Sequence, residues 1–258
     1  MGDILLRQSQ VALAVAIGEE MLKSGGEVNR VDDTVKRVLA HYGFSSYNVI
    51  IISNGIFVTV DESGENPVSC VRNVPSWSID LGKIAELNKL SRDICSSKCS
   101  VDEANSKLEG IRGMNIKPTW TETVATGVES AAFCYILGGQ IIDIMIALVI
   151  GCLLKMFLNM SARKDLSKFI RHIIGSILTT ILAVLCHCVV EDILVDKVII
   201  GSIMILVPGV ALTTSIRDFF SGDYLSGSIH LIDALLTAVC ISTGVGVAMK
   251  TFMLMGLV

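Results

Sequence analysis

The residues best suited to chemistry follow a proline–glycine pair inside an apolar stretch of the C-terminal half. Pro208-Gly209 interrupts this stretch, and hydroxyl, charged and imidazole side chains follow within 24 residues of it at Thr213, Thr214, Arg217, Asp218, Asp223, His230 and Asp233. A bilayer offers no water to unpaired backbone groups. A broken helix therefore survives there mainly where protein buries it or where it lines a cavity. The pattern predicts a path for a polar solute, with these residues along it.

Each residue near the break also has a plainer interpretation. Pro208-Gly209 can be an ordinary kink, since both residues are tolerated in membrane helices. Thr213 and Thr214 suit a substrate carboxylate or hydroxyl, but they equally suit local bonds to freed backbone groups. Arg217 can hold a carboxylate through its planar fork, or it can anchor the chain at the membrane surface.

The acidic residues beyond the break admit two roles as well. Asp218 and Asp223 fit either a gate beside Arg217 or the caps of helix ends. His230 and Asp233 stand three residues apart and hence on one helical face. There they can relay protons or form a structural hydrogen-bonded pair.

Two further carboxyl groups, Glu129 and Asp143, fall within other apolar runs. A low-dielectric setting favours the protonated form of a carboxyl, which suits a proton-coupling site. Ionisable residues at membrane depth usually serve function, and the alternative is a buried hydrogen bond between helices. We expect Glu129 and Asp143 to belong to the substrate or proton path.

The distribution of apolar residues predicts where these groups are held. Apolar residues make up 52% of the chain, and most of the charge lies before residue 119. We expect a membrane α-helical bundle of five transmembrane helices in residues 119–258, preceded by a small cytoplasmic α+β domain in residues 1–118. Each span is near the roughly 20 residues that a bilayer requires. The spans are expected at about 120–137, 140–159, 171–190, 197–216 and 227–250.

The N-terminal part shows the signals of a compact domain in the order ααβββαα. Ser24-Gly25-Gly26 ends the first helix, and Ser100 with Glu103 forms a capping box before the last one. Asn54-Gly55 is a strong hairpin signal between two β-rich runs. The elements are expected at 3–23, from 28 to a close at 41–43, at 47–53, 56–61, 68–74 and 78–95, and from the capping box at 100–103 to about 112.

The charges of two loops predict the topology. Loop 160–171 carries Arg163, Lys164, Lys168 and Arg171, whereas loop 191–197 is mainly acidic, with Glu191 among its residues. Lys and Arg concentrate on the cytoplasmic side of membranes, so we expect the first loop inside and the second outside. The N-terminus shows no secretory signal. We therefore expect a multi-pass protein of the plasma (cytoplasmic) membrane with a cytoplasmic N-terminal domain and an extracytoplasmic C-terminus.

Several functional classes find no support in the sequence. A net charge of −4 and the lack of a basic aromatic groove argue against nucleic acid. Cys95 and Cys99 are one helical turn apart, but no second pair has metal-ligand spacing. We expect no metal, no cofactor and no enzymatic activity, because no nucleophile–base pair stands out.

Three motifs resemble signatures of a known family. Gly18 and Leu22, followed by the run Ser24-Gly-Gly-Glu-Val-Asn-Arg-Val-Asp-Asp33, resemble the opening signature of the threonine/serine exporter family in its large-subunit form. Residues 208–227 look like the second signature, and residues 137–143 resemble a third, weaker one. Within the opening signature, Gly26, Glu27, Arg30 and Asp33 suggest a domain-docking role. The plainer interpretation of the last three is a solvated, salt-bridged helix face.

The resemblance implies a membrane subunit of a secondary exporter of small hydrophilic metabolites, with threonine and serine as the leading substrates. The alternatives are a dicarboxylate (succinate) exporter subunit and a regulatory or scaffolding membrane subunit. The resemblance also implies a small membrane partner that supplies a second half, giving a hetero-oligomer. A homo-oligomer is a further possibility.

Overall fold

The computed structural model describes residues 2–61, 67–74, 79–114, 119–162, 166–190 and 192–256. Arg163, Lys164 and Glu191, on which part of the topology prediction rests, lie outside these residues. The chain forms two compact units: Met1–Ile116 with Arg217–Ile229, and Lys117–Ile216 with His230–Val258. Residues 217–229, which lie beyond the expected domain boundary at residue 118, thus group by their contacts with the first unit.

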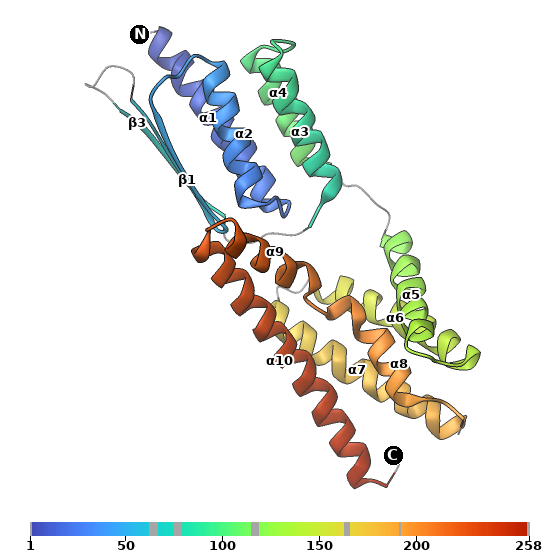
Figure 1. The fold of residues 1–258 in the computed structure, drawn as a ribbon. Coiled ribbons are helices and arrows are strands. Elements are labelled where there is room, and N and C mark those ends of the chain that lie inside the picture. The colour runs from blue at the N-terminus through green and yellow to red at the C-terminus, as the bar shows by residue number, and fades with distance from the viewer. Residues whose placement is uncertain are drawn as a thin grey trace. The chain divides into compact units, whose positions relative to one another are not determined.

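The first unit has three layers, with one helix pair between a sheet and a second helix pair (Figure 1). The middle helix α1 has buried residues on several of its sides, among them Leu13, Ala14, Val15 and Ile17. This follows from its sequence, because a helix with apolar residues on all of its sides is stable only where other elements pack against each side. The elements are α1 (Gly2–Lys23), α2 (Val28–His41), β1 (Tyr47–Ile52), β2 (Gly55–Val60), β3 (Val68–Asn73), α3 (Leu81–Cys95) and α4 (Val101–Arg112).

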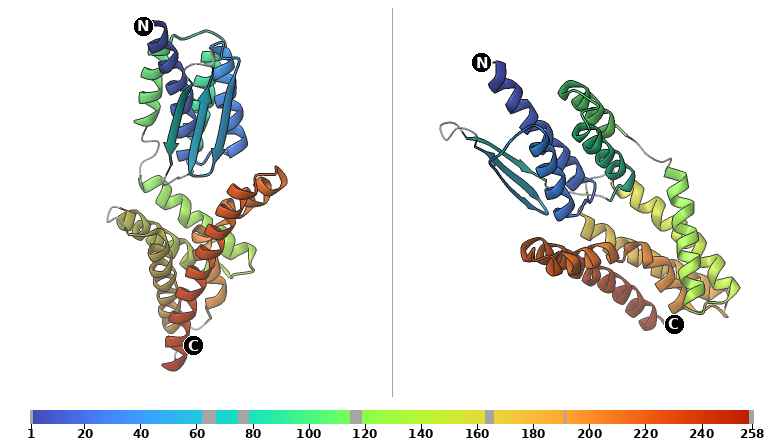
Figure 2. Two further views of the ribbon diagram at one scale, coloured as in Figure 1. Left: turned by 90° about the vertical axis from the view of Figure 1, so that its left-hand side faces the viewer. Right: turned by 45° about the horizontal axis from the view of Figure 1, so that its top comes forward.

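The sheet is antiparallel in the order β1-β2-β3. Ile56, Val58 and Val60 of β2 are buried, which is the alternation that a strand with one covered face requires. The left-hand view of Figure 2 looks onto the other face. There Ile50, Phe57 and Val71 are exposed and lie in one row of register partners.

The β1–β2 hairpin differs from its predicted turn by one residue. Ile52 pairs with Gly55, so the loop consists of Ser53 and Asn54, and Gly55 begins β2. An Asn-Gly turn of the usual hairpin type needs positive φ at both residues. Among the described residues, neither Asn54 nor Gly55 has a positive φ. The hairpin prediction was right, and its placement of the turn was wrong.

The second unit is helical. Its elements are α5 (Thr119–Ile136), α6 (Ile141–Ala162), α7 (Lys168–Val189), α8 (Val195–Ile203) and the short 3-10 helix η1 (Met204–Leu206), with parts of α9 (Gly209–Phe220) and α10 (Tyr224–Leu254). Within the described residues, α6, α7 and α10 are long and apolar enough to cross a membrane. The segment Val195–Leu206 with Gly209–Phe220 qualifies as a fourth span only if the bent pair is counted as one. The helix α5 is not among these candidates, so the five-span arrangement stays a prediction.

Small residues bring the helices of this unit together. A Cβ added to Gly151 of α6 would lie 2.2 Å from Ser130 Oγ of α5, and one added to Gly201 of α8 would lie 2.9 Å from the Cys134 backbone nitrogen. A Cβ added to Gly244 of α10 would lie 2.6 Å from the Ile173 carbonyl oxygen of α7. Close backbone approach of this kind is how helices associate where lipid removes the hydrophobic driving force.

Candidate functional site

The apolar segment after α8 is broken where the sequence predicts a break. Helix α8 and η1 end at Leu206, α9 begins at Gly209, and the two parts meet at 57°. Val207 is extended, with φ −65° and ψ 127°, as the residue before a proline tends to be. A single local bond, from Gly209 N–H to the Val207 carbonyl, closes the corner at 2.8 Å. The break leaves backbone groups outside the regular helical ladder, where a solute or a partner can meet them.

The hydroxyls after the break are not gathered in one place. Thr213 is exposed and donates to the Gly209 and Val210 carbonyls at 3.0 Å each, which is the local bonding that the plainer interpretation described. Thr214 is half-buried on the same helix, and Ser215 is fully buried.

Asp143 is fully buried at the start of α6, and both of its oxygens have partners. Oδ2 accepts the Gln140 N–H at 2.7 Å, and Oδ1 accepts the Leu194 N–H at 3.0 Å. The first bond satisfies a free donor at the helix start, and the second ties that start to the chain before α8. Asp143 therefore holds two segments together, whatever part it plays in a path.

Glu129 is half-buried on α5, next to the buried Ser130. Among the described residues, the side-chain oxygens of Ser130 and of Ser202 on α8 have no hydrogen-bond partner. The Ser130 hydroxyl lies against Gly151, where α5 packs on α6, whereas Ser202 follows Gly201, which packs on Cys134 of α5. Buried hydroxyls without partners are costly and suit a polar ligand. The sequence analysis missed both, although small residues four apart on α5 were the available signal.

Asp233 has a partner that the sequence did not indicate. The Lys168 ammonium nitrogen, at the start of α7, lies 2.5 Å from each Asp233 carboxylate oxygen. The side chains are 40% and 25% exposed, respectively, so the pair is only partly shielded from its surroundings. His172 Nδ1 lies 2.6 Å from the Lys168 carbonyl oxygen. His230 is half-buried on α10, three residues before Asp233.

The opening signature forms the end of α1 and the start of α2 in the first unit. Gly25 has φ +78°, and the N–H groups of Gly25 and Gly26 bond the Leu22 and Met21 carbonyls. This double bond pattern with a left-handed glycine is the Schellman ending of a helix. Gly26 has no room for a side chain, because a Cβ would lie 2.7 Å from the Met21 carbonyl oxygen. The glycines are thus explained by backbone geometry.

The polar residues of the two main signatures meet in the first unit. Arg217, from the second signature, forms an ion pair with Glu27, which also lies 3.7 Å from Arg30. The Ser53 N–H of the β1–β2 turn donates to Ser226 Oγ at 3.3 Å, and Ser226 is fully buried. Sequence reasoning considered these residues separately and missed both pairings.

The acidic residues between α9 and α10 occupy helix-end positions. Gly222 has φ +82°, and Asp223 N–H bonds the Asp218 carbonyl, again in a Schellman ending. Asp223 then caps α10, because its Oδ1 accepts the Ser226 N–H at 3.2 Å. Asp218 is 2% exposed. Asp33 is exposed on α2, near the end of the opening signature.

The expected path residues are divided between the two units. Glu129, Asp143, Pro208, Gly209, Thr213, Thr214, His230 and Asp233 lie in the second unit, whereas Arg217, Asp218 and Asp223 group with the first. Their convergence on one cavity stays a prediction. Among the described residues, no three His, Cys, Asp or Glu side chains are grouped to hold a metal ion.

A family model described as "Putative threonine/serine exporter" matches residues 12–252. The chain belongs to the threonine/serine exporter family. The match covers α1 through most of α10 and includes both units. Together with the long apolar helices of the second unit, this match identifies the chain as a multi-pass membrane protein.

Two relatives in the exporter family are similar along most of this chain. A protein of Mycobacterium tuberculosis (strain ATCC 25618 / H37Rv) named "Probable threonine/serine exporter" is 24% identical over 250 residues, which are 96% of this chain and 47% of that protein. The "Threonine/serine exporter" of Corynebacterium glutamicum is 23% identical over 257 residues, covering 95% and 53%. The chain thus spans about half the length of these relatives. No solved structure matches it.

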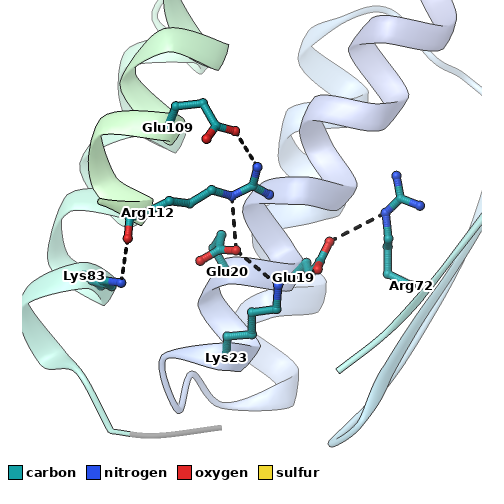
Figure 3. Close-up of polar contacts among 7 residues, drawn as sticks. All are labelled: Glu19, Glu20, Lys23, Arg72, Lys83, Glu109 and Arg112. Carbon is teal, nitrogen blue, oxygen red and sulfur yellow. Dashed lines mark hydrogen bonds and ion pairs between the residues drawn. The ribbon is translucent and has the colours of Figure 1, made fainter. Parts of the chain in front are cut away.

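This member of the exporter family also carries a charged cluster that the sequence analysis missed. Figure 3 shows Arg112, at the end of α4, between Glu109 and the buried Glu20 of α1, with nitrogen–oxygen distances of 2.5 and 3.1 Å. Burial lowers the pKa of Arg112, but the hydrogen bonds and charges of Glu109 and Glu20 outweigh it and raise the pKa overall. The hydrogen bond to Glu19 raises the pKa of Lys23. The cluster joins α1 to the end of α4.

Proposed function

We propose that this chain is a membrane subunit of a secondary exporter of small hydrophilic metabolites, with threonine and serine as its substrates. The observation that carries the proposal is the family match over residues 12–252. The names of the two relatives support the proposed substrates, and both relatives are about twice as long as this chain.

The second unit supports a transport role through two features. One is the corner at Pro208-Gly209, which takes backbone groups of an apolar segment out of the helical ladder. The other is the presence of two buried hydroxyls, those of Ser130 and Ser202, that have no hydrogen-bond partner among the described residues. Such hydroxyls suit the ammonium, carboxylate or hydroxyl of a small amino acid. Asp143 contributes by holding the starts of α6 and α8 in place.

We also propose that a separate membrane protein supplies the second half of the transporter, that the complex lies in the plasma membrane, and that the N-terminal domain is cytoplasmic. A relative about twice as long contains room for two such halves, and secondary transporters commonly place their site where two halves meet. Labelling of a Ser161→Cys variant from outside the cell would contradict this topology.

Counterflow in liposomes tests the function. Vesicles with this chain and its second half are loaded with unlabelled threonine, and uptake of labelled threonine, serine and succinate is followed. We expect threonine and serine to accumulate transiently and to compete, and succinate to do neither. Pro208→Ala with Gly209→Ala should straighten the corner and lower counterflow while most of the protein stays folded. Succinate counterflow without threonine counterflow would instead make the protein a dicarboxylate exporter.

A further inference from the structure

Residues 217–229, the last turn of α9, the following turn and the first turns of α10, contact the N-terminal domain through the side chains of Arg217 and Ser226, among others. We call residues 217–229 the latch segment. Arg217 reaches Glu27 at the start of α2, and Ser226 reaches the Ser53 N–H at the β1–β2 turn. The segment is itself well formed, because a Cβ on Gly227 would lie 2.9 Å from the Phe219 ring. The segment thus contacts the start of α2 and the β1–β2 turn, two separate places on the domain.

Both contacts are of the kind that breaks at low cost. The Arg217 side chain is 55% exposed, and ion pairs so open to their surroundings contribute little to stability. The bond between Ser53 and Ser226 is a single neutral hydrogen bond at 3.3 Å. Each of these two contacts is thus specific in position and weak by itself.

Glu27 has a second arginine available when Arg217 leaves. Its Oε2 lies 3.7 Å from Arg30 Nε on the same helix, while its Oε1 faces Arg217. The Glu27 carboxylate is therefore not left without an opposite charge when Arg217 leaves.

The other end of α9 is a corner that can turn. Pro208-Gly209 joins α8 to α9 at 57°, and a Cβ on Gly209 would meet no atom within 4 Å. Between the corner and Arg217, α9 is a regular helix. The corner at Pro208-Gly209 lies at one end of α9, and the contacts of Arg217 and Ser226 lie at or beyond the other. Release of these contacts allows α9 to rotate about the corner as one rigid element.

We propose that the latch segment binds to the N-terminal domain reversibly, and that the domain thereby controls the angle between α8 and α9. In the latched state Glu27 and Ser53 hold the segment. On release, α9 turns about Pro208-Gly209 and changes the backbone groups that the corner presents to a solute. Glu27, Ser53, Arg217 and Ser226 are positioning residues in this scheme, which rests on the transport function proposed above.

A disulfide that locks the latch tests the proposal directly. Ser53→Cys and Ser226→Cys are combined in a variant whose eight native cysteines are replaced. Oxidation should join the two positions, lower counterflow by about tenfold, and allow full recovery after reduction, because only the released state completes the cycle. Thr59→Cys with Ser69→Cys is the matched control, since their hydroxyls lie 3.1 Å apart on the sheet, away from the latch. That disulfide should leave counterflow unchanged.

A second measurement keeps the test independent of transport. Thr213 is exposed on α9, so the maleimide labelling rate of a Thr213→Cys variant reports the movement of this helix. Locking should slow this labelling even in a preparation that transports none of the substrates. The protein without the disulfide could show no counterflow while the disulfide still changes the labelling rate at position 213. That result would reject the proposed transport function and would leave the latch proposal intact.

The charge pair provides the last arm. Glu27→Gln and Arg217→Gln should each raise the labelling rate at position 213 several-fold, and the double variant should give no further increase, because either change removes the same pair. Asp32→Asn, which removes an ion pair within α2, should have no effect. Failure of the 53–226 disulfide to form would overturn the attachment. Unchanged counterflow and labelling in the locked protein would show a fixed strut instead of a latch.

Discussion

The two units of this chain differ in the residue types that pack their helices together. In the first, the largest buried side chains are aliphatic, such as Leu13, Ile17 and Met21 of α1. In the second, glycine and hydroxyl residues such as Gly151 and Ser130 make close contacts between helices beside two smaller apolar clusters, and many large apolar side chains are exposed. Water drives the first arrangement, because it rewards burial of apolar area. Lipid removes that reward, so close fit and polar contacts decide the second.

The largest loss of stability is expected when a buried aliphatic side chain is removed from the core of the first unit. Ile17→Ala removes a fully buried side chain from the middle layer and should lower stability by about 2–5 kcal/mol. Leu5→Ala on the same helix is the control, because Leu5 is 63% exposed. Thermal unfolding of the full chain measures both. Equal losses would show that α1 is not the centre of the first core.

The introduction of a large side chain tests the close packing of helices in the second unit. Gly151→Leu forces a side chain into the space of Ser130 and should cost about 3 kcal/mol, with separation of α5 from α6. Gly246→Leu is matched to it, since a Cβ there meets no atom within 4 Å. The yield of monodisperse protein after extraction and its melting temperature report the difference. Similar behaviour of the two variants would contradict close packing at Gly151.

A smaller loss is expected at the buried carboxylate of the second unit. Asp143→Asn keeps the size but turns one acceptor into a donor that faces an N–H group, at a cost of about 1–3 kcal/mol. We expect counterflow to fall as well, because the starts of α6 and α8 shift. Asp196→Asn, with a 63% exposed side chain, is the control. Normal melting with lost counterflow would assign Asp143 to the path itself, whereas normal counterflow would exclude it.

The smallest effect concerns thiol reactivity in the first unit. Burial raises the pKa of the Cys95 and Cys99 thiols above their ordinary value, so little thiolate forms at neutral pH. A folded-state pKa above the unfolded one adds stability below the unfolded pKa, and that stability is lost as pH rises through the folded pKa. Alkylation followed by mass spectrometry should be slower in the native than in the denatured chain, with the gap closing at alkaline pH. Equal rates at neutral pH would show that the thiols are not shielded.

Local signals in the sequence were enough for much of the fold. The capping box of Ser100 and Glu103 is present, and the break after Leu206 follows from proline chemistry. Periodicity also indicated α2, whose Val31, Val35 and Val38 are buried. Patterns of this kind depend on near neighbours, which the sequence displays directly.

The partners of charged residues could not be predicted in the same way. Arg217 with Glu27 and Lys168 with Asp233 are separated by long stretches of chain, and only the tertiary fold decides which charges meet. The buried donors that Asp143 satisfies are backbone groups, which carry no sequence signal at all. The turn of the first hairpin was misplaced for a related reason, since its conformation is set jointly by both strands and not by Asn54 and Gly55 alone.

The bond between Ser53 and Ser226 has a consequence for the order in which the chain is made. Its two residues are 173 positions apart, so at ordinary rates of synthesis the second leaves the ribosome about 9–35 s after the first. All of the residues of α5 through α9 are made in that interval. The edge of the N-terminal domain at Ser53 therefore stays without this contact until α5 through α9 have been made.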